Sequence, residues 1–297
     1  MLATFLAVAI LANVEGRRGV AGSAVPGPPI IGACLLDQTD ETGGWGFGKP
    51  PYPALHVAPC SGPRWGEVVS VLPNALTSST SVLTTDASGA QVTDNPVQHR
   101  CDDSKFAYLG VGAVSRPQFG SWFLRTGDIA AVGPSDVQRA AGQSWVACIV
   151  TPRNGHSAAA TRYTGSVRNI LVNGALPVAF ATCSQLAPGP AGILPARCDQ
   201  AHQVEIFGYA TTSPRDTQAQ LNASCLELVR SLMRNSDPTK KGLLRIRAFT
   251  THIDLSTGAT TEGLGSNGAA TCIVGPFDQH QLIGTLFGLG LNPIPWA

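Results

Sequence analysis

Glutamate and histidine side chains at recurring distances from cysteines are the residues of this sequence whose types could support chemistry. There are five of them: Glu67, His156, His202, Glu205 and His280. A carboxylate beside an imidazole can act as a general base and acid, or the two can hold a metal ion. They can also hydrogen-bond inside the fold and orient its strands. We favour this structural interpretation over metal binding, and metal binding over catalysis.

The common catalytic motifs are absent from the sequence. It contains no Gly-x-Ser-x-Gly elbow, no Ser-x-x-Lys pair and no His-Glu-x-x-His helix, so the usual serine and zinc routes to hydrolysis are unsupported. We therefore expect no catalytic residue set, no metal and no cofactor. The alternative is an extracytoplasmic enzyme or a metal-binding protein that uses the glutamate and histidine residues.

The eight cysteines fall into two sets of four with matching spacing. The interval from Cys101 to Cys148 is 47 residues, and the interval from Cys225 to Cys272 is also 47. In each set an earlier cysteine is followed by a glutamate seven residues later, and the last cysteine is followed by a histidine eight residues later. These matches indicate two tandem copies of one four-cysteine module, and internal repeats of this kind determine the architecture of a chain.

The sequence around the cysteines repeats as well. The segment "WVACIV" ends at Val150 and "AATCIV" ends at Val274. Further on, "YTGSV" at residues 163–167 stands where "LIGTL" stands at residues 282–286. The duplication therefore extends beyond the cysteines themselves.

An even number of cysteines without the usual structural zinc spacing favours disulfides over metal binding. Disulfides in turn favour an oxidising compartment; the alternative is a set of buried free thiols in a cytosolic protein. Within a module three pairings are possible, and we favour the pairing of first with second and third with fourth. The expected disulfides are Cys34–Cys60, Cys101–Cys148, Cys183–Cys198 and Cys225–Cys272.

Composition and the N-terminus bear on location and partners. Charged residues make up only 13% of the 297 residues and the formal net charge is +1, so no long-range field or basic stripe favours nucleic acid. An apolar run at residues 2–12 suits a signal-peptide core better than a membrane span, although no positive charge precedes it. Residues 1–30 are thus expected to be an export or anchor segment with a linker, which makes membrane attachment through the N-terminus an open alternative to secretion, as is a buried N-terminal helix.

The first module is expected to span residues 31–172. Its strands are predicted around Cys34 and over residues 54–60, 67–72, 121–124 and 144–150. Residues 74–95 are polar and are expected to form a long surface loop. Asn95-Pro96 has the form of a helix start, and the helix should stop near Gly110.

The second module is expected to span residues 178–297, with a helix that opens at Ser213-Pro214. Its apolar residues fall at helical spacing on one face, with a cysteine among them: Leu221, Cys225, Leu228, Val229 and Leu232. That face must cover a sheet, whose strands are predicted over residues 243–253, 272–274 and 282–286.

Several short stretches resemble the septum formation domain of actinobacterial envelope proteins. The resemblance covers both modules and is carried by Gly32-Ala33-Cys34, by Cys198 with His202, Val204 and Glu205, by Trp145-Val146-Ala147-Cys148, and by Thr164-Gly165-Ser166. It implies a domain on the outer side of the cytoplasmic membrane with a role in cell division or envelope assembly. No catalytic residues are implied by it.

We therefore expect an α+β protein of two tandem repeats, each a small, mainly antiparallel sheet with one long helix and two disulfides. The expected function is a non-catalytic binding or scaffold role in the cell envelope, linked to septum formation. Its partners would be envelope or division proteins or cell-wall glycan, and not nucleic acid. Its location would be extracytoplasmic, either membrane-anchored or secreted.

Overall fold

We describe the fold from a computed structural model of the chain. The residues that the structure describes are 24–36, 56–75, 82–85, 91–110, 122–124, 126–152, 162–173, 176–186, 194–253, 260–265 and 268–297. The apolar run at residues 2–12 and the candidate His156 lie outside these ranges. Among the helices within them, none has the length and apolar character needed to cross a membrane.

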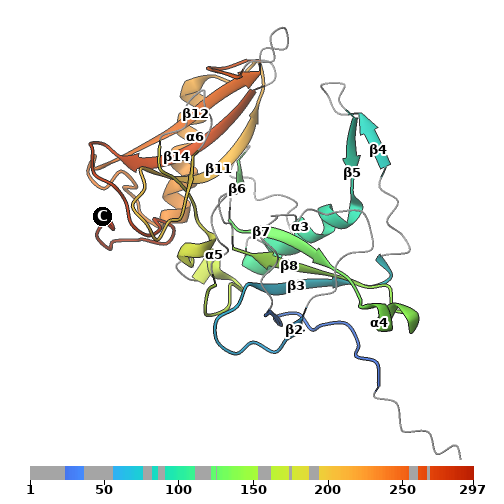
Figure 1. Ribbon diagram of the computed structural model, residues 1–297. Coiled ribbons are helices and arrows are strands. Elements are labelled where there is room, and N and C mark those ends of the chain that lie inside the picture. The colour runs from blue at the N-terminus through green and yellow to red at the C-terminus, as the bar shows by residue number, and fades with distance from the viewer. Residues whose placement is uncertain are drawn as a thin grey trace, which may run out of the picture.

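The protein is α+β, with two main antiparallel sheets and four disulfides (Figure 1). The first sheet has the strand order β2-β1-β3-β8-β7. Its strands are β1 (Cys34–Leu35), β2 (Val57–Ala58), β3 (Gly66–Leu72), β7 (Asp128–Val132) and β8 (Val146–Thr151). Helix α3 (Pro96–Leu109) packs on β3, β7 and β8.

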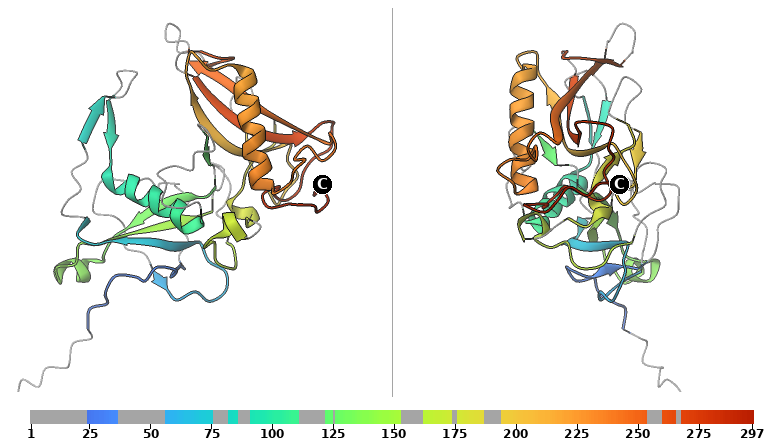
Figure 2. Two further views of the ribbon diagram at one scale, coloured as in Figure 1. Left: turned by 180° about the vertical axis from the view of Figure 1, so that it is seen from behind. Right: turned by 90° about the vertical axis from the view of Figure 1, so that its left-hand side faces the viewer.

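The second sheet has the strand order β10-β9-β11-β14-β12-β13. Its strands are β9 (Thr182–Ser184), β10 (Pro195–Ala196), β11 (Val204–Thr212), β12 (Leu244–Ile253), β13 (Thr260–Glu262) and β14 (Gly268–Pro276). Helix α6 (Gln218–Met233) lies across one face of this sheet, as the left view of Figure 2 shows. We call the opposite face, away from α6, the outer face of the second sheet.

Both long helices begin and end for identifiable reasons. Asn95 caps α3 by accepting bonds from two backbone N–H groups, and the helix stops at Gly110, whose φ of 99° is left-handed. The predicted bounds of this helix are thus confirmed. Helix α6 begins later than predicted, because Thr217 and Gln220 form a capping box there, whereas Ser213 belongs to a turn closed by Asp216.

The apolar faces predicted for the second module are buried as expected. The predicted apolar face of α6 is buried, and its residues are Leu221, Cys225, Leu228, Val229 and Leu232. The prediction of a strand over residues 282–286 is wrong, however. Leu282 makes isolated bridges to His202 and Trp296, and the following residues form a turn at Gly284, because Gly284 adopts a φ of 111° that ends any extended run.

Other elements were not predicted. The loop expected at residues 74–95 contains a hairpin of β4 (Val82–Thr85) and β5 (Gln91–Asp94). Strand β7 and the short helices α4 (Asp136–Ala140) and α5 (Ile170–Asn173) were also missed. The signal for the hairpin was its β-branched valines and threonines.

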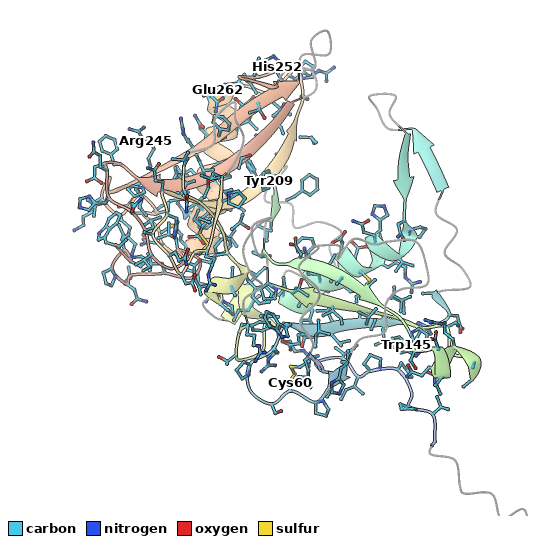
Figure 3. The ribbon with its side chains drawn as sticks, in the orientation of Figure 1. Cys60, Trp145, Tyr209, Arg245, His252 and Glu262 are labelled. Atoms are coloured by element: carbon cyan, nitrogen blue, oxygen red, sulfur yellow. A yellow bond between two sulfur atoms is a disulfide. The ribbon has the colours of Figure 1, made fainter. Side chains whose placement is uncertain are left out.

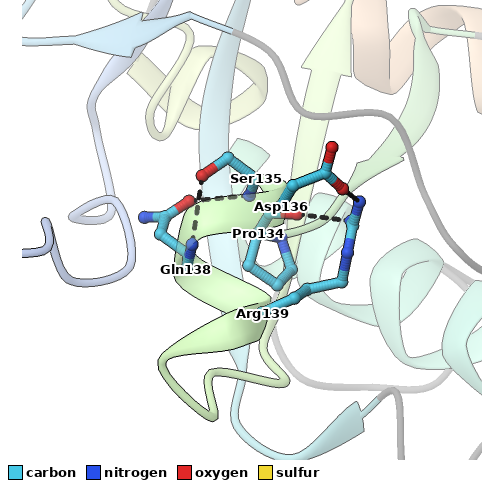
Figure 4. Close-up of polar contacts among 5 residues, drawn as sticks. All are labelled: Pro134, Ser135, Asp136, Gln138 and Arg139. Atoms are coloured by element: carbon cyan, nitrogen blue, oxygen red, sulfur yellow. Dashed lines mark hydrogen bonds and ion pairs between the residues drawn. The ribbon is translucent and has the colours of Figure 1, made fainter.

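Helix α4 shows how a short element can be fixed locally (Figure 4). Its N-cap Ser135 and Gln138 form a reciprocal capping box, and Arg139 donates to the Pro134 carbonyl oxygen at 2.6 Å and pairs with Asp136. The Gln138 amide also donates to the carbonyl oxygen of Pro26 at 3.0 Å. The helix therefore holds the N-terminal segment against the edge of the first sheet.

The four disulfides are the pairs favoured from the sequence: Cys34–Cys60, Cys101–Cys148, Cys183–Cys198 and Cys225–Cys272. Two of them join a long helix to the strand beneath it, Cys101 of α3 to β8 and Cys225 of α6 to β14. The other two join the chain after a short edge strand to its neighbour. All eight cysteines are paired.

The two sheets share one continuous core. Strand β6 (Phe123–Leu124) follows the first helix in sequence but pairs with β11, at Gly208 and Tyr209, in the second sheet. Next to it Trp122 is 1% exposed and donates its indole N–H to Ser224 of α6 at 2.9 Å. A strand that follows α3 thus completes the edge of the other sheet, and the two halves are tied together by packing.

We predict that Trp122→Ala destabilises both halves together by about 3 to 5 kcal/mol, since a large side chain is removed from a closed core. Ser224→Ala removes the hydroxyl that accepts from Trp122 and donates to the Leu221 carbonyl oxygen, and it should cost about 1 kcal/mol. Urea unfolding followed by tryptophan fluorescence and far-UV circular dichroism measures both. A loss below about 1 kcal/mol for Trp122→Ala would contradict the shared core.

The disulfides should differ in their contribution to stability. Cys225 and Cys272 close a loop of 47 residues, and Cys183 and Cys198 close one of 15. Loop-closure entropy predicts that the paired substitution Cys225→Ala with Cys272→Ala costs about 4 kcal/mol and Cys183→Ala with Cys198→Ala about 3 kcal/mol. Equilibrium unfolding of the two variants would show the reverse order if this explanation is wrong.

Candidate functional site

Glu205 is a fully buried carboxylate that holds a turn far away in sequence. It sits on β11 with an exposed fraction of 0%. Its two oxygens accept bonds from the Thr285 hydroxyl at 2.5 Å and from the Leu286 backbone N–H at 2.6 Å. The Thr285 hydroxyl oxygen also accepts the Phe287 N–H at 3.1 Å. The carboxylate therefore ties β11 to the turn that begins at Gly284.

Glu67 on β3 has the same set of partners. It is 1% exposed, and it accepts bonds from the Ser166 hydroxyl at 2.6 Å and from the Val167 N–H at 3.1 Å. The Ser166 hydroxyl oxygen accepts the Arg168 N–H at 3.1 Å. Tyr108 of α3 adds a third donor to this carboxylate through its hydroxyl. We call each of these arrangements a glutamate clamp.

The surroundings of the two clamps differ in how they stabilise charge. Burial raises the pKa of Glu205 to about 7, against the pull of the Thr285 and Leu286 donors. In the first clamp, burial and then the hydrogen bond to Glu67 raise the pKa of Tyr108 to about 12. Leu232 stands seven residues after Cys225, as Tyr108 does after Cys101, so the second clamp has no phenol at that place.

The histidines do not join these carboxylates. His280 is exposed and pairs with Asp278 at 2.7 Å, and its ring lies 5.3 Å from that of Trp296. His202 is fully buried: its Nδ1 lies 2.8 Å from the Gln200 carbonyl oxygen, and burial lowers its pKa. The Nε2 atom of His202 has no hydrogen-bond partner among the described residues. His156 lies outside the described residues.

These positions give the two glutamates a structural role. Glu205 bonds to the turn and not to His280, so the proposed base and acid pair is not formed there. No group of three or more histidine, cysteine or acidic side chains in the described ranges could hold a metal ion. The clamps orient the ends of β3 and β11, which is the interpretation favoured from the sequence.

A groove of about 530 Å³ lies on the outer face of the second sheet. Residues from β11, β12, β14 and the turn after β14 line it, among them Gln203, Val204, Arg245, Arg247, Ile273 and His280. The position of the groove follows from the alternation of side chains along β12. Leu244 and Ile246 point into the core beneath α6, while Arg245 and Arg247 point outward. Figure 3 shows Arg245 near the start of β12 and His252 near its other end.

The two arginines of the groove are held by aromatic rings. The Arg245 guanidinium lies 4.9 Å from the centre of the Phe277 ring, and that of Arg247 lies 5.9 Å from the centre of the Phe249 ring. Neither forms an ion pair with an acidic residue in the described ranges. Stacking of this kind fixes a guanidinium without using its N–H donors, which stay available for an oxyanion.

Comparison of the chain with protein-family models, curated proteins and solved structures gave no match. The site is therefore interpreted from its own contacts. The groove arginines were not predicted, although the alternation of Leu244, Arg245, Ile246 and Arg247 gives a period-two signal of a strand with one basic face. Of the predicted polar residues that the structure describes, only His280 lines the groove.

The raised pKa of Glu205 makes stability depend on pH. A carboxyl group whose pKa is about 7 when folded and 4.5 in the unfolded chain binds its proton more tightly in the folded state. Its stabilising contribution is therefore complete below about pH 4.5 and is lost as the pH rises through about 7. Relative to Glu205→Gln, the wild type should lose on the order of 3 kcal/mol between about pH 4 and about pH 8.

Urea unfolding across this pH range measures the difference. Glu227→Gln is a matched control, because it removes the same charge from an exposed position of α6. A parallel pH dependence for the wild type and Glu205→Gln would show that the buried carboxyl does not titrate in this range.

Proposed function

We propose that the chain consists of two copies of one module, at residues 31–172 and 178–297, each with an antiparallel sheet, one long helix and two disulfides. The strand pairing supports this. Glu67 lies opposite Val150 and Glu205 opposite Val274, and in both pairs the register shifts within the next three residues. Seven residues before each of these glutamates, a cysteine forms a disulfide with the strand that pairs with the glutamate strand, β1 or β9.

Further matches between the two sheets support the same proposal. The central strands follow one another in the same order in both sheets. The cysteine on β8 lies opposite Ala131 of β7, and the cysteine on β14 lies opposite Ala248 of β12. The two clamps use a hydroxyl and the following N–H in the same way. Short helices α4 and α5 would then be additions to the first copy.

We further propose that the protein is a non-catalytic binding or scaffold protein of the cell envelope, located outside the cytoplasm and linked to septum formation. Four disulfides support an oxidising compartment, and the link to septum formation rests on the resemblance of its cysteine frame. The observation that carries a binding role is the groove on the outer face, where two arginines lack an acidic partner among the described residues.

The alternative, an enzyme or metal-binding protein built on the glutamate and histidine residues, has less support. Both glutamates are buried and their oxygens are occupied by donors of the fold. A buried carboxylate in a clamp has no access to a substrate. The exposed His280 is paired with Asp278, at the rim of the groove, where it fits a binding role.

A genetic test follows from the groove. In the host that carries this chain, deletion should delay or misplace septa, and a copy with Arg245→Glu and Arg247→Glu should fail to restore them, because charge reversal repels an anionic partner. Arg215→Glu, a single charge reversal outside the groove, should restore them. Septum spacing is measured by membrane staining.

Two results would contradict the proposal. Normal septa after deletion would remove the link to division, and full complementation by the doubly reversed variant would remove the groove as the binding surface. Non-reducing gels of the exported protein must show the same oxidised form for all variants, so that loss of folding is recognised.

A further inference from the structure

We propose that the groove on the outer face of the second sheet binds an acidic polypeptide segment, one that carries carboxylates at alternate positions and an apolar side chain between them. The inference rests on the proposed function and names the class of its partner. It is argued from charge, from the aromatic rings around the groove and from the first sheet.

The charge of the groove fits carboxylates at the spacing of an extended chain. Arg245 and Arg247 are two positions apart on β12, so their side chains leave the same face about 7 Å from each other. Alternate side chains of an extended peptide have the same spacing. Asp278 is the one acidic residue among the described residues that line the groove, and its carboxylate is engaged by His280. Each guanidinium therefore offers donors in a fork that matches a carboxylate.

The aromatic rings favour a peptide over a sugar. Arg245 covers a face of Phe277, Arg247 lies over Phe249, and His280 lies against Trp296. Phe249 is only 5% exposed, so its ring has no open face for a sugar to stack on, and Arg245 covers one of the two faces of Phe277. A peptide instead brings carboxylates to the guanidiniums and an apolar side chain to the floor.

The apolar part of the groove has a place for that side chain. Val204 and Ile273 form part of its lining, and Phe277 and Leu243 are exposed beside it, with exposed fractions of 64% and 53%. The Phe277 N–H donates to the Leu243 carbonyl oxygen at 2.9 Å, so the two side chains belong to one patch. Arginine and aromatic side chains around an apolar centre are the composition of protein interfaces.

The first sheet shows that the module does not need these arginines in order to fold. In register with the strand that carries the last cysteine, Asp128, Ala130 and Val132 of the first sheet lie where Arg245, Arg247 and Phe249 lie in the second. Ala130 and Val132 are at most 1% exposed, in an apolar cluster with Ile149. In the first sheet this face is closed by packing, and in the second it is open and basic.

A peptide would lie across the face and would not extend the sheet. Strand β12 is paired with β14 along its length and with β13 only at residues 251–253. Before β13 begins, the Ala248 N–H donates to Asn222 of α6 and the Ala248 carbonyl oxygen accepts from Gln218, so these groups are not free to pair with a peptide. Binding through side chains makes the affinity depend on salt and on both arginines.

The test uses the full chain and fluorescence anisotropy at low and at physiological ionic strength. The probe is a fluorescein-labelled peptide, Ser-Gly-Glu-Leu-Glu-Leu-Glu-Gly, and the control peptide has glutamine in place of each glutamate. We expect the acidic peptide to bind at least about tenfold more tightly than the control, and Arg245→Gln with Arg247→Gln to weaken it at least about tenfold. Arg215→Gln, outside the groove, should change the affinity less than about twofold.

The lysine variants separate charge from geometry. Arg245→Lys with Arg247→Lys keeps both charges but loses the planar fork, so its affinity should lie between those of the wild type and of the glutamine variant. Unfolding midpoints of all variants in urea must match that of the wild type. Should the double glutamine variant unfold early, the single variant Arg245→Gln, at an exposed position, replaces it.

Equal binding of the acidic and control peptides, or unchanged binding by the double variant, would overturn the inference. Sodium polygalacturonate, tested as a competitor, would overturn the peptide class if it bound in the groove more tightly than the peptide does. Either result together with failed septum complementation by the charge-reversed variant would leave the proposed function standing and remove only its partner class.

Discussion

A buried carboxylate bonded to a distant turn is the interaction on which this structure depends. An ionised or titrating carboxyl without partners would cost several kcal/mol inside a protein, so each glutamate is acceptable only when the hydroxyl and N–H of its turn are in place. Glu67 needs Ser166 and Val167, and Glu205 needs Thr285 and Leu286. The central strand of each sheet and the last turn of each half are consequently positioned together.

The disulfides surround this interaction. In the second sheet Cys183 lies directly opposite Glu205, and in the first Cys34 lies opposite Glu67. The long helices are then attached through Cys101 and Cys225 to the strand on the other side. A covalent link on each side of the glutamate strand restricts the unfolded chain and keeps the sheet in register. The glutamate and histidine spacing that suggested chemistry is explained, for the glutamates, by architecture.

Much of this arrangement could be predicted from the sequence, for reasons that are local. The disulfide pairing favoured among the three possible in each set is confirmed, Asn95-Pro96 and Gly110 predicted the bounds of α3, and helical spacing predicted the buried face of α6. Leu282 to Leu286 was misassigned as a strand because its apolar residues hide a left-handed glycine. The pairing of β6 with β11 and the clamp donors were beyond local reasoning, because they join residues far apart in sequence.

The two sheets share a frame and differ on the face away from the helix, where one is closed by apolar packing and the other carries a basic groove. The disulfides and buried glutamates that the two sheets share are therefore the features on which the rest of the structure depends. Their most direct test is non-reducing peptide mass mapping of the protein purified from its native host. We expect four disulfides, each within one half: Cys34–Cys60, Cys101–Cys148, Cys183–Cys198 and Cys225–Cys272. Free thiols throughout, or disulfides between the two halves, would contradict this expectation.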